Sequence, residues 1–127
     1  INMYLTRKNM KVLFVCVGNT CRSQMAEAIA KDLGHEAYSA GTHPGEKIAP
    51  NAIRVLSEIG ISVENQFPKS TDEIESHSFD KIISMGCGVN CPNLRISQDW
   101  NLEDPHGREI NFYRETRDKI LNYLSDL

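Results

Sequence analysis

A cysteine, two turn-forming residues and an arginine lie close together early in the chain. Cys16 follows the apolar residues 12–15, and a segment containing Gly18 and Asn19 separates it from Arg22. Glycine and asparagine tolerate the positive φ angles that a nest of backbone N–H groups needs. Such a nest at a helix N-terminus binds an oxyanion, and an arginine can hold two of the anion's oxygens. The pattern predicts an oxyanion-binding loop with a cysteine at its start.

The cysteine gives this loop more than an anion-binding role. A thiol that faces N–H groups, a helix dipole and a guanidinium ionises easily, and the thiolate is the nucleophilic form. The alternative is a structural cysteine at the end of a buried strand, which leaves the neighbouring residue types unexplained. We therefore predict that Cys16 is a catalytic nucleophile. The predicted oxyanion-binding residues are Val17, Gly18, Asn19, Thr20, Cys21, Arg22 and Ser23.

A second cysteine pair lies in the middle of the chain. Cys87 and Cys91 are separated by three residues, and Gly86 and Gly88 flank the first of them. Glycine allows the backbone to rearrange, which a redox pair needs when one sulfur moves between partners. The alternative is two small residues that pack beneath a loop. We predict that both cysteines are catalytic.

The third group is an acidic turn near residue 104. Pro105 directs Asp104 towards an extended conformation and stiffens the loop. A carboxylic acid held over the anion could protonate a leaving oxygen, so we predict that Asp104 is a general acid. Glu103 is the alternative acid, and a simple turn without catalytic function is the other interpretation.

Composition excludes several classes of protein. The chain has 127 residues, 24% of them charged, and a formal net charge of −3, so we expect neither nucleic acid nor an anionic membrane as a partner. No apolar run approaches the ~20 residues of a membrane span. We expect a cytoplasmic monomer with one domain over residues 1–127. Its catalytic part spans residues 10–127, and residues 1–9 are a flexible leader or a remnant of cloning.

The four cysteines favour reactive chemistry over a disulfide framework in a reducing compartment. A zinc site is the competing interpretation, but Cys16 and Cys21 would have to leave the anion loop to form it. We therefore expect neither a metal centre nor a cofactor.

Hydrophobic periodicity predicts alternating strands and helices. Strands are expected at residues 12–15, 36–40 and 79–85, with a fourth at 94–96 or 100–102. Helices are expected at residues 23–33, 51–59 after Pro50, 70–75 with a capping box at 70–73, and 109–125. This order predicts an α/β fold with a small four-stranded parallel sheet and helices on both faces. Because ligands bind at the carboxyl ends of such strands, we expect Cys16, Cys87 and Asp104 to converge.

The Cys-x5-Arg-Ser signature, followed by Met-Ala-Glu-Ala, resembles the low-molecular-weight tyrosine phosphatase family from Lys11 to the C-terminus. Family phosphatases usually have proline after the Arg-Ser pair and tyrosine after the Asp-Pro pair. This chain has Gln24 and His106 at those positions. The second cysteine pair is similar to that of the thioredoxin-coupled arsenate reductases of the family, which often space the two cysteines more widely. The resemblance implies the phosphatase fold and favours the arsenate-reductase branch.

For such a reductase, the resemblance implies a cascade of thiols. Cys16 attacks arsenate in the loop while Asp104 protonates the departing hydroxide. Cys87 then attacks Cys16, and arsenite leaves with two electrons. Cys91 attacks Cys87, and thioredoxin, the implied partner, reduces the resulting disulfide. Phosphate and sulfate are expected to compete with arsenate.

The resemblance also implies supporting roles. Asn19 and Ser23 would hold the loop and stabilise the thiolate, and Cys21 would be a packing or tuning residue. Some family members bind a monovalent cation near the loop, at positions that match Asn19, Glu27, Ser39, Ser70 and Asp72.

Two other functions stay open. A phosphatase acting on phosphotyrosine or a small phosphate ester would need only Cys16, Arg22 and Asp104. A non-catalytic oxyanion or redox sensor would signal through a disulfide between Cys87 and Cys91.

Overall fold

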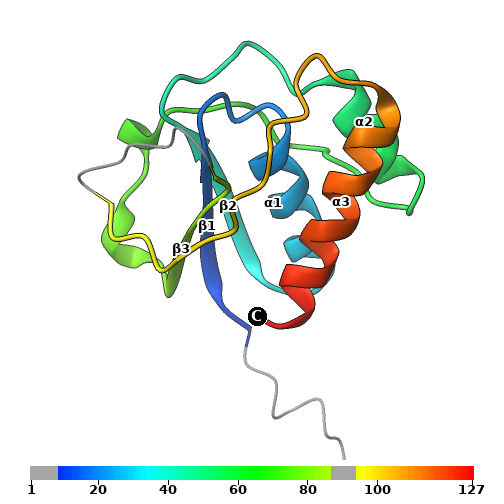
Figure 1. Ribbon diagram of the computed structural model, residues 1–127. Coiled ribbons are helices and arrows are strands. Elements are labelled where there is room, and N and C mark those ends of the chain that lie inside the picture. Colours follow the sequence, from blue (N-terminus) through cyan, green and yellow to red (C-terminus); the bar gives the residue numbers. More distant parts are fainter. Residues whose placement is uncertain (1–8, 87–93) are drawn as a thin grey trace, which may run out of the picture.

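The computed structural model describes residues 9–86 and 94–127 (Figure 1). The predicted Cys87 and Cys91 pair lies outside the described residues, as does most of the predicted leader. Within the described part, one sheet of parallel strands has the order β2-β1-β3-β4. Its strands are β1 (Lys11–Cys16), β2 (Glu36–Gly41), β3 (Lys81–Ser84) and β4 (Gln98–Asp99).

The helices differ in length and type. The α-helices are α1 (Arg22–Asp32), α2 (Pro50–Ser57) and α3 (Ile110–Ser125), and the 3-10 helices are η2 (Thr71–Glu73) and η3 (Ser76–Ser78). Pro50 occupies the first turn of α2, where its missing N–H would have no partner. The predicted capping box is present at Ser70 and Glu73, but it opens the short η2 rather than an α-helix.

Strand β1 lies inside the sheet and is buried on both faces. Val12 and Phe14 pack in a cluster with buried residues of α1, α2 and α3, whereas Leu13 and Val15 belong to a second cluster on the opposite face. The residues that directly follow η2 and η3, Ile74 and Phe79, pack against the second cluster. Helical segments therefore cover both faces, as predicted, but all three α-helices lie on one of them (Figure 1).

The fourth strand differs from both predicted positions. Neither residues 94–96 nor residues 100–102 form it, because β4 consists of Gln98 and Asp99, which pair with the end of β3. Both side chains are exposed, so backbone hydrogen bonds at the sheet edge define this strand and no apolar pattern marks it. Strand β3 is also shorter than the predicted residues 79–85.

An ionic cluster joins α2 to α3. Glu58 follows α2, and its carboxylate accepts hydrogen bonds from Arg114 (Nη2–Oε2, 2.6 Å) and Arg117 (Nη1–Oε1, 2.9 Å). Arg117 of α3 also donates to the carbonyl of Val55 at 2.9 Å. The hydrogen bond from Arg114, followed by that from Arg117, lowers the pKa of Glu58 to about 2.

Trp100, the only tryptophan of the chain, joins the sheet to α3. Its ring lies 5.6 Å from that of Phe14 in β1 and stacks at 4.9 Å, with an interplanar angle of 8°, on Tyr123 of α3. Its backbone N–H donates to the carbonyl of Ser84 at 2.9 Å. The segment that leads to Asp104 is therefore anchored in the core at its start.

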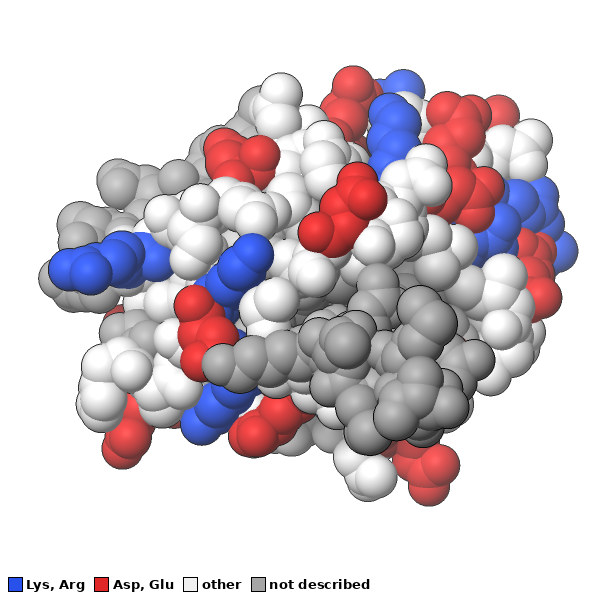
Figure 2. Space-filling view, turned by 90° about the horizontal axis from the view of Figure 1, so that it is seen from below, with Lys and Arg blue, Asp and Glu red and all other residues white. Residues whose placement is uncertain are grey.

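The surface seen in Figure 2 carries acidic and basic side chains of both signs side by side. This mixture fits the small net charge of the sequence and contrasts with the basic stripe of a nucleic-acid-binding face. In the described part of the chain, no helix is both long enough and apolar enough to cross a membrane.

Candidate active site

The predicted anion loop lies at the carboxyl edge of the sheet, which is uppermost in Figure 1. Cys16 is the last residue of β1, and α1 begins at Arg22, so residues 17–21 form the turn between them. Cys16 is in register with Gly41, the last residue of β2. A Cβ at Gly41 would lie only 2.5 Å from the carbonyl oxygen of Val17, so glycine lets β2 end directly against the loop.

Residues outside the turn hold the carbonyl groups of the loop. Four of these bonds come from the segment that follows β2, and one comes from α1. Their donors and acceptors are Thr42 N–Cys16 O, His43 N–Val17 O, Gly45 N–Gly18 O, Ala49 N–Thr20 O and Met25 N–Cys21 O, at 2.8 to 3.1 Å. The described chain contains no cis peptide, so each carbonyl held outward turns the N–H of the next residue inward. The loop is therefore a nest of N–H donors.

The sulfur of Cys16 lies within this nest. It is hydrogen-bonded to the Ser23 hydroxyl at 2.8 Å and accepts from the backbone N–H of Asn19 at 3.1 Å. Asn19 has a φ of 55°, and its side-chain amide donates to Ser23 (2.8 Å) and to Ser39 (2.9 Å). Its side-chain oxygen accepts from the backbone N–H of Lys69 at 2.9 Å. Asn19 and Ser23 are thus placed directly at the predicted nucleophile.

Arg22 is almost completely buried beside the nest, with 3% of its surface exposed. Nη1 donates to the carbonyl of Leu102 at 2.9 Å, and Nη2 lies 3.8 Å from an Asp104 carboxylate oxygen. Among the described residues, Nε of Arg22 is the one buried side-chain nitrogen or oxygen atom that has no hydrogen-bond partner. The edge of the guanidinium that carries Nε and Nη2 is therefore available to an anion.

The structure brings Asp104 to the loop and gives Glu103 another partner. One Asp104 oxygen accepts from the His106 backbone N–H at 3.0 Å, while the other approaches Arg22. The Glu103 carboxylate is instead paired with Arg108 at 2.9 Å. The side chain of Asp104 is 53% exposed, so it can exchange protons with solvent. Of the two predicted acids, Asp104 is the one whose carboxylate lies beside Arg22.

The thiol of Cys21 contacts α3. Its sulfur lies 3.7 Å from the Tyr113 hydroxyl and 3.6 Å from that of Thr20, and the residue is buried. Burial raises the pKa of the Cys21 thiol, so this sulfur is protonated at neutral pH. The backbone of Cys21 belongs to the nest, whereas its side chain is part of the buried core cluster.

Three of the five predicted cation-binding residues share one chain of hydrogen bonds. Asn19 donates to Ser39, and Ser39 donates to Glu27 at 2.6 Å. The protein's own ammonium groups also lie here, because Lys31 pairs with Glu27 at 2.6 Å and Lys69 Nζ donates to the Ser39 carbonyl at 3.2 Å. The other two residues, Ser70 and Asp72, belong to the cap of η2. Over residues 9–86 and 94–127, no group of three or more His, Cys, Asp or Glu side chains could hold a metal ion.

Several supporting residues were not recognised in the sequence. The sequence predicts neither a strand nor a helix at residues 42–49, yet N–H groups of this segment fix the nest. Gln24 was noted as a departure from the family pattern and was given no role. Its fully buried side chain donates to the carbonyl of Asn19 at 3.0 Å and accepts from Gln66 at 2.8 Å. The available signal was that Gln24 is a polar residue near the start of a predicted helix and has small and apolar neighbours.

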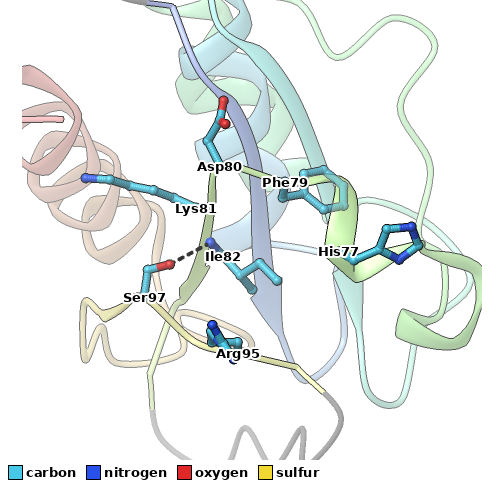
Figure 3. Close-up of a pocket in the computed structure, with 7 residues that line it drawn as sticks. All are labelled: His77, Phe79, Asp80, Lys81, Ile82, Arg95 and Ser97. Carbon is cyan, nitrogen blue, oxygen red and sulfur yellow. Dashed lines mark hydrogen bonds between the residues drawn. The ribbon is translucent and has the colours of Figure 1, made fainter.

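Two cavities show where a ligand could approach. One, of about 480 Å³, opens beside the nest and is lined by Thr20, Lys47, His106 and Tyr113, among others. The other, of about 430 Å³, is shown in Figure 3 and lies at the opposite end of β3, where Lys81 begins that strand. The side chains of His77 and Lys81 point in opposite directions there (Figure 3). Of these two cavities, only the first is lined by a residue of the anion loop, Thr20.

Comparison with known proteins assigns this chain to a family. Residues 11–127 match the model of the low molecular weight phosphotyrosine protein phosphatase family. The chain belongs to this family. A solved structure of the family, the low molecular weight protein tyrosine phosphatase from T. tengcongensis, is 30% identical. It has a TM-score of 0.74, and the match covers 94% of this chain and all of that one.

Other relatives within this phosphatase family are arsenate reductases. The glutaredoxin arsenate reductase of Synechocystis sp. is 36% identical over 124 residues, which cover 92% of this chain and 95% of the relative. A solved structure described as an arsenate reductase in the phosphate binding state is also 36% identical. Its TM-score is 0.84, and the match covers 91% of this chain and 93% of that one. The predicted family and fold are confirmed.

Proposed function

We propose that this chain is an arsenate reductase in which Cys16 attacks arsenate held in the nest. The observation that carries the proposal is the unpaired, buried Nε of Arg22 beside the N–H donors of the loop. A buried cation with an unpaired donor is costly, and a bound oxyanion relieves that cost. The similarity to arsenate reductases over nine-tenths of the chain supports arsenate as that oxyanion.

The first step forms a bond between sulfur and arsenic. The Cys16 thiolate attacks arsenic as the bond from arsenic to one hydroxyl oxygen breaks. Asp104 donates a proton to that oxygen, so the hydroxyl group leaves as water. Hydrogen bonds from the Asn19 N–H and the Ser23 hydroxyl stabilise the thiolate before the attack. The Arg22 fork and the inward N–H groups hold the remaining oxygens.

The second step transfers two electrons to arsenic. The Cys87 thiolate attacks the Cys16 sulfur, the sulfur–arsenic bond breaks, and its electron pair stays on arsenic, which leaves as arsenite. Cys91 then attacks Cys87 and releases Cys16 as a thiolate. The two electrons have then come from the thiols of Cys87 and Cys91, which are left oxidised as a disulfide that an external dithiol must reduce. We propose thioredoxin as this dithiol.

Thiol mapping by mass spectrometry tests the cascade. After arsenate is added without reductant, the wild type should accumulate the Cys87–Cys91 disulfide and release one arsenite per protein. Cys91→Ser should release the same arsenite but trap the Cys16–Cys87 disulfide, and Cys87→Ser should release none. Cys21→Ser is the matched control and should behave as wild type, because its thiol faces Tyr113. Normal turnover by both Cys87→Ser and Cys91→Ser would rule out the cascade.

The reductant needs a separate comparison, because the Synechocystis relative is named for glutaredoxin. Arsenate turnover should be measured with thioredoxin and its reductase, and in parallel with glutaredoxin and glutathione. We expect faster turnover with thioredoxin, since the proposed disulfide is internal to the chain. Turnover with glutaredoxin alone would reject thioredoxin as the partner and leave the Cys16 chemistry intact.

A phosphatase is the second candidate, and the similarity to a protein tyrosine phosphatase favours it. Cys16, Arg22 and Asp104 suffice for hydrolysis of a phosphate ester, because water can release phosphate from sulfur without a redox step. Under this alternative, p-nitrophenyl phosphate is hydrolysed at enzymatic rates and Cys87→Ser changes nothing. A binding-only sensor, in contrast, would turn over neither arsenate nor the ester.

A further inference from the structure

One carbonyl of the anion loop is held differently from its neighbours. The carbonyl groups of Cys16, Val17, Gly18, Thr20 and Cys21 accept hydrogen bonds from backbone N–H groups. The carbonyl of Asn19 accepts instead from a side chain, the Nε2 amide of Gln24, at 3.0 Å. The orientation of the peptide between Asn19 and Thr20 therefore depends on one glutamine.

The glutamine is itself held in place. Gln24 is fully buried, and Gln66 Nε2 donates both to its side-chain oxygen (2.8 Å) and to its backbone carbonyl (3.1 Å). The bond from Gln66 occupies the amide oxygen of Gln24 and leaves its NH₂ group directed at Asn19. The pair of glutamines thus forms a clamp that joins residue 66 to the anion loop.

Without the clamp, the peptide between Asn19 and Thr20 could flip. Asn19 has a φ of 55°, a conformation that is strained for most residues and that asparagine tolerates. Its side chain is fixed by Ser23, Ser39 and Lys69, but these bonds do not fix the peptide that follows. If that peptide turned, the nest would lose the Thr20 N–H and would present a carbonyl oxygen to the anion.

We propose that Gln24 is a positioning residue whose amide, held by Gln66, keeps the Thr20 N–H directed at the bound oxyanion. The inference rests on the oxyanion-binding part of the proposed function. It also explains the departure from the usual family pattern, since a proline at this position has no side-chain donor. Gln24 acts through the backbone and does not itself touch the anion.

Titration with inorganic phosphate tests the clamp by calorimetry and by NMR of the loop amides. In the wild type, phosphate should move the amide resonances of Val17, Gly18 and Thr20 downfield. Gln24→Met keeps the volume and the helix propensity but loses the donor. It should bind phosphate about tenfold more weakly, which is the effect of one charge-assisted hydrogen bond. The Thr20 resonance should no longer shift, whereas those of Val17 and Gly18 should.

Two further variants make the test decisive. Gln66→Met should also weaken phosphate binding, but less than Gln24→Met does, because the amide of Gln24 remains and loses only its fixed orientation. Gln98→Met removes a comparable side-chain bond, to Trp100 Nε1 at 3.0 Å in the edge strand, and should bind phosphate as wild type does. If Gln24→Met does not fold, Gln66→Met alone decides the question.

Two results would overturn the inference in different ways. Unchanged phosphate affinity with an unchanged Thr20 shift in both clamp variants would show that the glutamines only stabilise the fold. A wild type that binds neither phosphate nor arsenate would remove the proposed function and the clamp's role with it.

Discussion

Replacing Gly41 by alanine should displace the anion loop without straining the backbone at position 41. Gly41 does not have a positive φ, so alanine can adopt its backbone conformation. The new Cβ, however, would lie 2.5 Å from the Val17 carbonyl oxygen and 3.0 Å from the Asn19 nitrogen. Normal contact needs about 3.5 Å, so the loop must move by roughly 1 Å. A shift of this size in a catalytic group costs about 100-fold in rate.

Steady-state arsenate reduction and thermal unfolding, measured side by side, check this prediction. Gly41→Ala should lower kcat/KM by about 100-fold. Gly60→Ala is the matched control, because Gly60 has a φ of 76° and no atom within 4 Å of the added Cβ. Alanine there is strained and should lower the melting temperature by several degrees while kcat/KM stays the same. A Gly41→Ala protein with wild-type kcat/KM would refute the argument from close approach.

Four further substitutions separate the roles of charged and thiol groups. Arg22→Lys should raise the dissociation constant for phosphate, because the fork is lost while the charge stays; Asp104→Asn should leave that constant unchanged and lower kcat by ~10²–10⁴. Identical patterns in both variants would contradict this division. Because the pKa of Glu58 is lowered to about 2, its carboxylate stabilises the fold above the unfolded pKa of about 4.3, and this contribution is lost as the pH falls towards 2. Urea unfolding should therefore separate wild type from Glu58→Gln at pH 6 but not at pH 2. Cys16→Ser should abolish arsenate reduction, whereas residual turnover above background would reject this nucleophile.

The parts of the fold that could be predicted are those with a strong local pattern. Residues 12–15 are apolar without interruption, and they became the inner strand because only a strand buried on both faces needs such a run. The helix predicted at residues 109–125 carries apolar residues at 3–4 spacing, and Arg117, which interrupts them, donates a hydrogen bond to Val55 of α2. Strand β4 has two exposed residues and is defined by its backbone pairing with β3, so no apolar side-chain pattern could reveal it.

The candidate site, like the fold, contains residues that the sequence could predict and residues that it could not. Cys16, Asn19 and Arg22 could be chosen as site residues from their types and spacing. An oxyanion site of this kind needs a nucleophile, a residue that tolerates a positive φ, and a guanidinium that binds two oxygens. The choice of Asp104 over Glu103 depends on Arg108, which takes the Glu103 carboxylate, and no spacing rule ranks the two acids. The contact between Gln66 and Gln24 joins residues that are far apart in the sequence. The packed fold creates this contact, so the sequence around neither glutamine could predict it.

The position of the single tryptophan has a practical consequence. Trp100 lies two residues before Leu102, whose carbonyl anchors Arg22, and four residues before Asp104. Its ring is fixed between Phe14 and Tyr123, so a movement of this segment relative to the sheet or to α3 alters the surroundings of the indole. The protein thus carries an optical probe next to its acid-bearing loop. Stopped-flow emission, with no added label, can time the response of that loop to an arriving oxyanion.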